Sequence, residues 1–146
     1  MINGDKNTLE ALKAVALERS NGFCYGCYVK AASVDNREVC PKCGSDDLMR
    51  ELDGVGVEYG LDWVVEAIVK EECDVIDIVE AYRDMLDECY EPISIGSLKY
   101  LPSQVLEAVD PVAFRIGCSE YADSMLEDSD VVEIDGLYYG VWGLLQ

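Results

Sequence analysis

The chain has 146 residues, of which 50% are hydrophobic, and a formal charge of −19 at pH 7 from 30 acids and 11 bases. This length and apolar content are sufficient for one ordinary core or two small ones, which argues against a disordered chain. Histidine is absent, so the commonest general base and the commonest nitrogen ligand for metals are both missing. We therefore expect a globular protein that is not an enzyme.

The start of the chain, "MINGDKNTLE", has neither a basic leader nor an apolar segment, and no run of eighteen apolar residues follows. These features predict a cytoplasmic protein with no membrane association. The seven cysteines are then expected to be reduced, because cytosolic thiol buffers reverse most disulfides. Metal binding or burial must account for them.

The charge is distributed unevenly along the chain. Residues 1–50 carry seven acids and seven bases, whereas residues 51–146 carry 23 acids and four bases. A field of that sign repels phosphate backbones and attracts basic surfaces. Direct nucleic-acid binding by residues 51–146 is therefore disfavoured, and a protein partner with a basic surface is favoured.

The first part of the chain predicts a helix and a cysteine-rich segment. The helix covers residues 7–19, with Asn7 as its cap and Glu10 three residues later. The cysteine-rich segment follows it, and "LMREL" at 48–52 predicts a strand. Three glycines in "DGVGVEYG" then suggest a junction, which divides the chain into residues 1–54 and 55–146.

Four cysteines form the pattern C-x2-C-x12-C-x2-C: Cys24, Cys27, Cys40 and Cys43. Two Cys-x-x-Cys turns supply the four thiolates of a tetrahedral zinc shell, which leaves no position for substrate or water. The spacing therefore predicts one structural Zn²⁺ per chain. A redox dithiol and a rubredoxin-type iron site are the alternatives, since Cys-x-x-Cys serves both.

The second pair reads "CPKCGS" and resembles the Cys-Pro-x-Cys-Gly knuckle of zinc-ribbon modules, over residues 22–52. The resemblance implies a treble-strand ribbon. The first pair departs from the family, because Tyr28 stands where a glycine often follows. The neighbouring bases Lys30, Arg37, Lys42 and Arg50 could form a basic rim, but four acids in the same segment balance them, which favours a solvated face over a nucleic-acid footprint.

The second part predicts helices and a terminal hairpin. One helix begins at Leu61, and another begins at a cap on Asp74 and runs to Tyr90. Residues 93–100 predict a strand or small hairpin, followed by helices near 103–109 and 111–126, the latter weakened by Gly117. Asp135 and Gly136 predict a type I′ hairpin within 131–142. The fold class is α+β, with a helical acidic domain after the ribbon.

Two groups of acids stand out in this part. The first recurs at three- and four-residue steps on the second helix and consists of Asp77, Glu80, Asp84, Asp87, Glu88 and Glu91. We call this first group the acidic ladder. It could bind a protein that normally binds nucleic acid, or it could only keep the helix soluble. The second group, near the C-terminal hairpin, consists of Asp123, Glu127, Asp128, Asp130 and Glu133. It lacks the pattern of a calcium loop.

Two functional hypotheses follow. The first is a small acidic regulatory protein that binds a protein partner, such as a phage-type inhibitor that mimics nucleic-acid charge on a host nucleic-acid enzyme. Residues 110–139 resemble small uncharacterised proteins of bacteriophages and mobile elements, which implies a source but no site residues. The alternative is a zinc-ribbon adaptor associated with nucleic acid or transcription, whose acidic part oligomerises or recruits partners.

Overall fold

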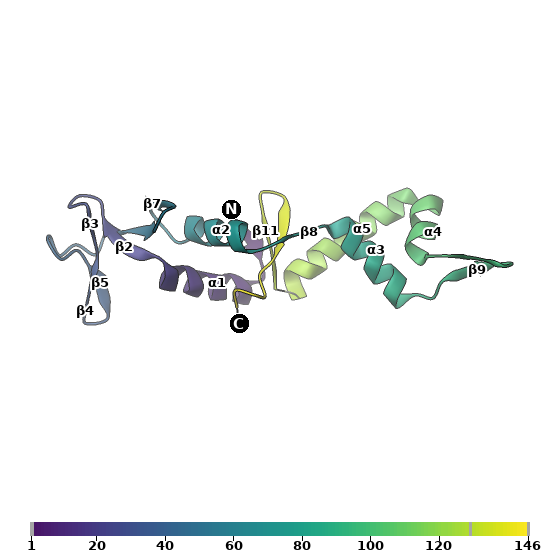
Figure 1. Ribbon diagram of the computed structural model, residues 1–146, viewed down its shortest axis with the longest axis horizontal. Helices are drawn as coiled ribbons and strands as arrows, with labels where there is room; N and C mark the ends of the chain where they lie inside the picture. Colours follow the sequence, from purple (N-terminus) through teal and green to yellow (C-terminus); the bar gives the residue numbers. More distant parts are fainter. Residues whose placement is uncertain (1, 129, 146) are drawn as a thin grey trace.

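A computed structural model describes residues 2–128 and 130–145 of the chain. The fold is α+β, as the sequence predicts, and it is elongated (Figure 1). Short strands and the turns that hold the four clustered cysteines lie at one end, a small sheet with two helices lies in the middle, and a group of helices lies at the other end. We call the two ends the ribbon (residues 21–58) and the arm (residues 77–128).

The middle of the molecule is built on a four-stranded antiparallel sheet. Its strands, in order, are β1 (Ile2–Gly4), β11 (Val131–Ile134), β12 (Leu137–Gly140) and β8 (Val75–Ile76). The turn between β11 and β12 has Asp135 at φ 52° and Gly136 at φ 83°, so the predicted C-terminal hairpin is confirmed with both turn residues in the left-handed region.

Two helices cover this sheet, α1 (Lys6–Arg19) and α2 (Asp62–Glu72). Leu12 and Ala16 of α1 pack into one buried cluster with α2 and with the strands β11 and β12. The cap of α1 is Asp5, whose carboxylate accepts from the amides of Asn7 and Thr8, so the predicted cap at Asn7 is wrong. The domain boundary near residue 54 stays a prediction, and α1 and α2 pack together across it.

The ribbon contains six short strands. Four form an antiparallel sheet in the order β3 (Val29–Lys30), β2 (Asn21–Cys24), β6 (Met49–Leu52) and β7 (Gly56–Glu58), and two form a hairpin, β4 (Ala32–Val34) and β5 (Arg37–Val39). The predicted strand at "LMREL" is thus β6, which pairs with β2.

A buried arginine ties the ribbon to the middle of the molecule. Arg50 of β6 is only 8% exposed, and its guanidinium donates to the hydroxyl and carbonyl oxygens of Ser20 and to the carbonyl of Leu17, at the end of α1. It also forms an ion pair with Glu38 of β5. One side chain therefore connects β6, β5 and α1.

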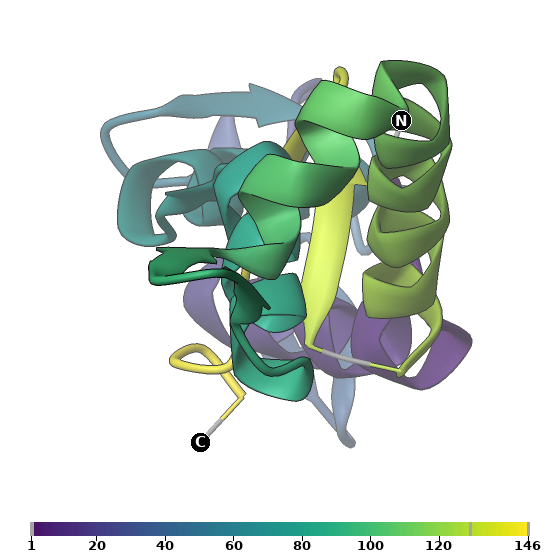
Figure 2. The same cartoon turned by 90° about the vertical axis from the view of Figure 1, so that its right-hand side faces the viewer.

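The arm contains three helices and a hairpin. They are α3 (Ile78–Cys89), β9 (Ile93–Ile95), β10 (Leu98–Tyr100), α4 (Pro102–Val109) and α5 (Pro111–Asp128). Figure 2 looks along the molecule with the arm nearest the viewer. The arm has a small core of its own in which Tyr82, Leu86 and Phe114 are buried. None of the described helices is both long and apolar enough to span a bilayer.

The start of α3 differs from the expectation. The sequence suggests a cap at Asp74, but Val75 and Ile76 instead form β8, which pairs with Tyr139 and Tyr138 of β12. The helix begins three residues later, where the Asp77 carboxylate accepts from the amide of Glu80. Pairing with β12, more than sixty residues later in the chain, thus overrides the helix-start signal at Asp74.

Candidate metal centre

The first cysteine knuckle is the turn between β2 and β3. Cys24 ends β2 and pairs with Val29, so the four-residue turn between them brings Cys27 back beside Cys24. Tyr28 closes the turn at φ 55°, a left-handed conformation that costs a residue with a Cβ about 1–2 kcal/mol. Its ring contacts that of Phe23 edge-on, with centroids 5.2 Å apart. A tyrosine thus occupies the position where the ribbon family often has glycine.

The second knuckle follows β5 and has the amide pattern of a metal-binding turn. The amides of Lys42 and Cys43 both lie 3.4 Å from Sγ of Cys40 and donate to it. Gly44, at φ 73°, donates its amide to the Cys40 carbonyl over 2.8 Å. The glycine in "CPKCGS" therefore serves the left-handed position that closes the turn.

The two knuckles bring the four cysteines together. Their Sγ atoms all lie within 4.8 Å of one another, and those of Cys24 and Cys43 are 3.8 Å apart. A tetrahedron with metal–sulfur bonds of about 2.3 Å has an edge of about 3.8 Å, whereas a disulfide requires about 2.05 Å. All four cysteines are free. The arrangement fits a metal ion held by four thiolates.

Hydrogen bonds shift the pKa values of two of these thiols in opposite directions. The amide of Cys43, with that of Lys42, stabilises the thiolate of Cys40 and lowers its pKa to about 6. Hydrogen bonds from Cys27 to the sulfurs of Cys40 and Cys43 favour its thiol form and raise its pKa to about 12. Four adjacent thiolates repel one another, so complete ionisation requires a cation between them.

The metal would be enclosed on one side only. Cys24 and Cys40 are buried, Cys27 is half-buried and Cys43 is exposed. Because four sulfurs saturate a tetrahedral shell, the site offers no open position for a reacting molecule. The donor set itself fits zinc and also fits iron. A metal ion bound there would join the two knuckles of the ribbon.

The other three cysteines lie apart from this cluster. Cys73 packs at the edge of the central core and Cys118 at the edge of the arm core, and burial raises the pKa of both thiols. Partial burial thus accounts for these two cysteines, one of the two explanations that the sequence offers. Cys89 differs, since it is exposed at the end of α3.

The bases that could have formed a rim are largely used in ion pairs. Lys30 lies 3.2 Å from Asp53 and 3.5 Å from Glu51, and Arg37 lies 3.5 Å from Asp46. Arg50 is buried, so it is not part of any rim. Within the described residues, Lys42 is the one base of the four for which no acidic partner is found. This pairing supports the interpretation that the charges of this segment balance.

The acidic ladder on α3 divides into engaged and available acids. Asp77 caps the helix, and Glu80 pairs with Arg83 at 2.7 Å. Asp87 accepts from the amide and the hydroxyl of Ser103, both at 3.0 Å. These three acids stabilise the arm. Within the described part of the chain, the remaining acids are exposed and have no partner: Asp84, Glu88 and Glu91.

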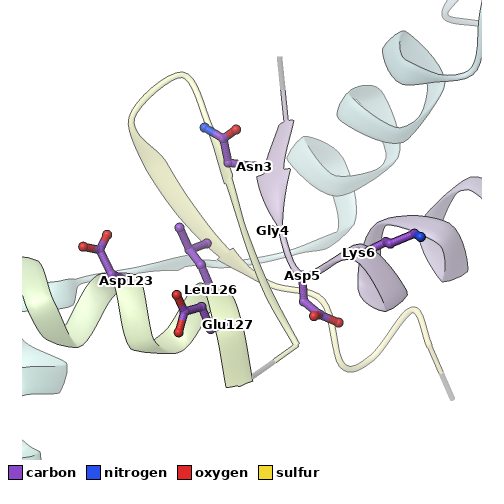
Figure 3. A pocket seen from close by; sticks show the side chains of 7 residues that line it. All are labelled: Asn3, Gly4, Asp5, Lys6, Asp123, Leu126 and Glu127. Carbon is purple, nitrogen blue, oxygen red and sulfur yellow. The ribbon is translucent and has the colours of Figure 1, made fainter.

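The second acidic group does not converge on one point. Asp123 and Glu127 of α5 line an open hollow of about 530 Å³ together with Asp5. Figure 3 shows the carboxylates of Asp5 and Asp123 pointing in opposite directions. Glu133 accepts a hydrogen bond from Asn3, and the side chain of Asp128 lies outside the described residues. Among the acids of this group that the structure describes, no set converges on a cation site.

Comparison with known proteins adds no relative to this picture. No protein-family model, no curated protein and no solved structure matches the chain. The four-cysteine cluster therefore carries the similarity to zinc ribbons by its spacing and geometry alone.

Proposed function

We propose that this protein is a small acidic zinc-binding regulatory protein that acts by binding another protein and not as an enzyme. Zinc at Cys24, Cys27, Cys40 and Cys43 holds the ribbon in its fold. The acidic arm binds a partner with a basic surface. The negative charge of the arm favours a partner that normally binds nucleic acid. The arm would inhibit that partner by mimicking the charge of the nucleic acid.

One observation carries the proposal. Residues 77–128 contain twelve acids and only three bases, Arg83, Lys99 and Arg115. Arg83 is already held by two carboxylates, Glu80 at 2.7 Å and Glu107 at 2.8 Å. The arm therefore presents a negative surplus that its own bases do not neutralise, and the charge of −19 on the whole chain exceeds the magnitude of about 2–8 that keeps a small domain soluble.

Charge reversal on the arm tests the proposal. The available acids Asp84, Glu88 and Glu91 are changed together to lysine, and acids that stabilise the arm are left intact. A matched control has the same change in charge at exposed acids of the middle and ribbon: Glu10, Glu18 and Asp47. Both variants and the original chain are immobilised and incubated with a bacterial lysate, with and without duplex DNA as competitor.

We expect the original chain and the control to retain proteins that DNA or raised salt displaces. The arm variant should lose them, because the attraction depends on the reversed charges. Equal retention by all three chains, or retention that duplex DNA leaves unchanged, would contradict charge mimicry on the arm.

A second candidate function rests on two tyrosines of the first knuckle. Tyr25 and Tyr28 are 67% and 75% exposed, with ring centroids 6.3 Å apart, and exposed aromatic rings can stack on unpaired bases. This arrangement favours a ribbon that contacts single-stranded nucleic acid through these rings, with Lys42 of the second knuckle as an exposed base that could contact its phosphates. A gel shift at low salt that is lost in Tyr25→Ala and Lys42→Glu would support it, and no shift would eliminate it.

A further inference from the structure

The hairpin at the tip of the arm has one apolar face that the chain leaves uncovered. The register pairs Ile95 with Leu98 and Ile93 with Tyr100, so these four side chains share one face, while Ser94 and Lys99 share the other. Their exposed fractions run from 38% for Ile93 to 65% for Ile95. Figure 1 shows this hairpin projecting beyond the helices. A two-stranded hairpin with an exposed apolar face is marginal without a partner.

A groove lies between this face and α4. It has a volume of about 550 Å³, and its lining is apolar apart from Gln104. Ile95 and Tyr100 come from the hairpin, and Val105, Ala108 and Val109 come from α4. Val109 is 78% exposed. Side chains from a strand face and a helix line this groove, which suits an occupant that inserts side chains and not one that extends the hairpin by backbone pairing.

An acidic hollow adjoins the groove. The hollow holds about 390 Å³ between α3 and α4, and Gln104 lines both spaces. Four carboxylates line the hollow against the single guanidinium of Arg83, whose Nε and Nη2 already donate to Glu107 and whose Nη1 donates to Glu80. Lys99 belongs to the opposite face of the hairpin. An occupant of the groove therefore meets negative charge beside it.

We propose that this groove binds an amphipathic basic helix of a partner protein, with apolar side chains in the groove and lysine or arginine over the acidic hollow. This inference rests on the proposed function and names its contact surface. Charge complementarity decides the occupant. A second copy of this chain would bring another acidic arm against the first and would be repelled. A helix with an apolar stripe and a basic flank would place the stripe in the groove and the flank over the acidic hollow.

Synthetic peptides of equal length test this inference. One carries leucines at helical spacing with lysines elsewhere, the second replaces the lysines with glutamates, and the third keeps the lysines and replaces the leucines with serines. Affinity is measured by fluorescence anisotropy, and the site is located from NMR shifts of the methyl groups of Ile95, Val105 and Val109.

We expect the first peptide alone to bind and to shift these methyl groups. The double variant Ile95→Gln and Val109→Gln should weaken that affinity about tenfold or more, because two apolar contacts are lost. Both positions are exposed, so the variant should fold. The control Val34→Gln with Val55→Gln, at similarly exposed ribbon positions, should bind normally. Equal binding of the serine or glutamate peptide would overturn the inference.

Two further outcomes keep the inference separate from the proposed function. If the groove variant still retains lysate proteins that the arm charge variant loses, the groove assignment fails and the proposed function stands. If the arm charge variant also retains them, the proposed function itself fails. Sedimentation of the free protein as a dimer that the groove variant dissociates would identify a second copy as the occupant and overturn the inference.

Discussion

The ring of Tyr82 in α3 lies directly over the bare backbone of Gly117 in α5. A Cβ at Gly117 would stand 2.0 Å from the Tyr82 hydroxyl oxygen and 2.6 Å from the ring carbon that bears it. Tyr82 also packs against Phe114 and Tyr121, with ring centroids 5.4 and 5.8 Å away. The glycine that seemed to weaken the predicted helix is thus the position where α3 and α5 approach each other.

Gly117→Ala should therefore destabilise the arm. Alanine is the better helix former by about 1 kcal/mol, but overpacking against Tyr82 costs more, and we expect a net loss of about 1–3 kcal/mol in thermal or chemical unfolding. Adding Tyr82→Phe should recover part of the loss, since the nearest atom is removed. Gly143→Ala, where nothing lies within 4 Å, is the control. A stabilised Gly117→Ala variant would refute this packing.

Arg50→Lys should destabilise the junction between the ribbon and α1. Lysine keeps the charge but cannot reach the Ser20, Leu17 and Glu38 oxygens together, and hydrogen bonds to charged groups contribute about 1.5–3 kcal/mol each. We expect a loss of about 2 kcal/mol or more in the free energy of unfolding. Arg37→Lys changes a pair that is about 70% exposed on both sides and should cost about 0.5 kcal/mol or less. Similar losses for the two variants would contradict the role of Arg50.

Asp87→Ala should loosen α4. The carboxylate of Asp87 receives the amide and hydroxyl of Ser103 at the start of that helix, while the residue before Pro102 provides no side-chain cap. Loss of a capping acceptor costs about 1 kcal/mol. Hydrogen exchange should rise selectively in Pro102–Val109. Asp84→Ala, one turn earlier and exposed, should leave this exchange unchanged, and an equal rise in both variants would show that Asp87 has no special role.

Removal of the metal should unfold the ribbon and spare the arm. A structural four-thiolate site contributes its binding free energy to folding, on the order of 10 kcal/mol or more for zinc. Native mass spectrometry should find one zinc per chain. Chelation should abolish amide protection in residues 21–58 and preserve it in Ile78–Cys89, since the arm has its own core.

Cysteine variants provide the control for that experiment. Cys43→Ser removes one of the four sulfurs and should reproduce the effect of chelation, whereas Cys89→Ser alters an exposed thiol outside the cluster and should keep the zinc. A metal-free chain with full protection in the ribbon would show that the cluster is not a structural site.

The sequence predicts local features of this fold well. The cysteine spacing predicts the cluster, because each Cys-x-x-Cys turn is set by a few neighbouring residues. Asp135 and Gly136 likewise predict the hairpin, because the pair supplies the positive φ angles that its turn requires. In both cases the geometry depends on contacts close in sequence.

Features that depend on residues far apart in the chain could not be predicted from the sequence. Arg50 looks like any other base of the ribbon until Ser20, thirty residues earlier, is folded against it. In the sequence, Asp87 is one more acid of the acidic ladder. Its role as the acceptor for Ser103 at the start of α4 is visible only in the folded chain. The alternation in residues 93–100 predicts a strand or small hairpin, but it cannot reveal that the chain leaves the apolar face of that hairpin uncovered.

The pairing of β1 with β11 also sets an order in which the parts can form during synthesis. Ile2 pairs with Ile134, so the central sheet cannot close until residue 134 has emerged. The outermost metal ligands, Cys24 and Cys43, are only nineteen residues apart. A nascent chain can therefore bring its four clustered cysteines together early, whereas β1 must wait for the hairpin of β11 and β12.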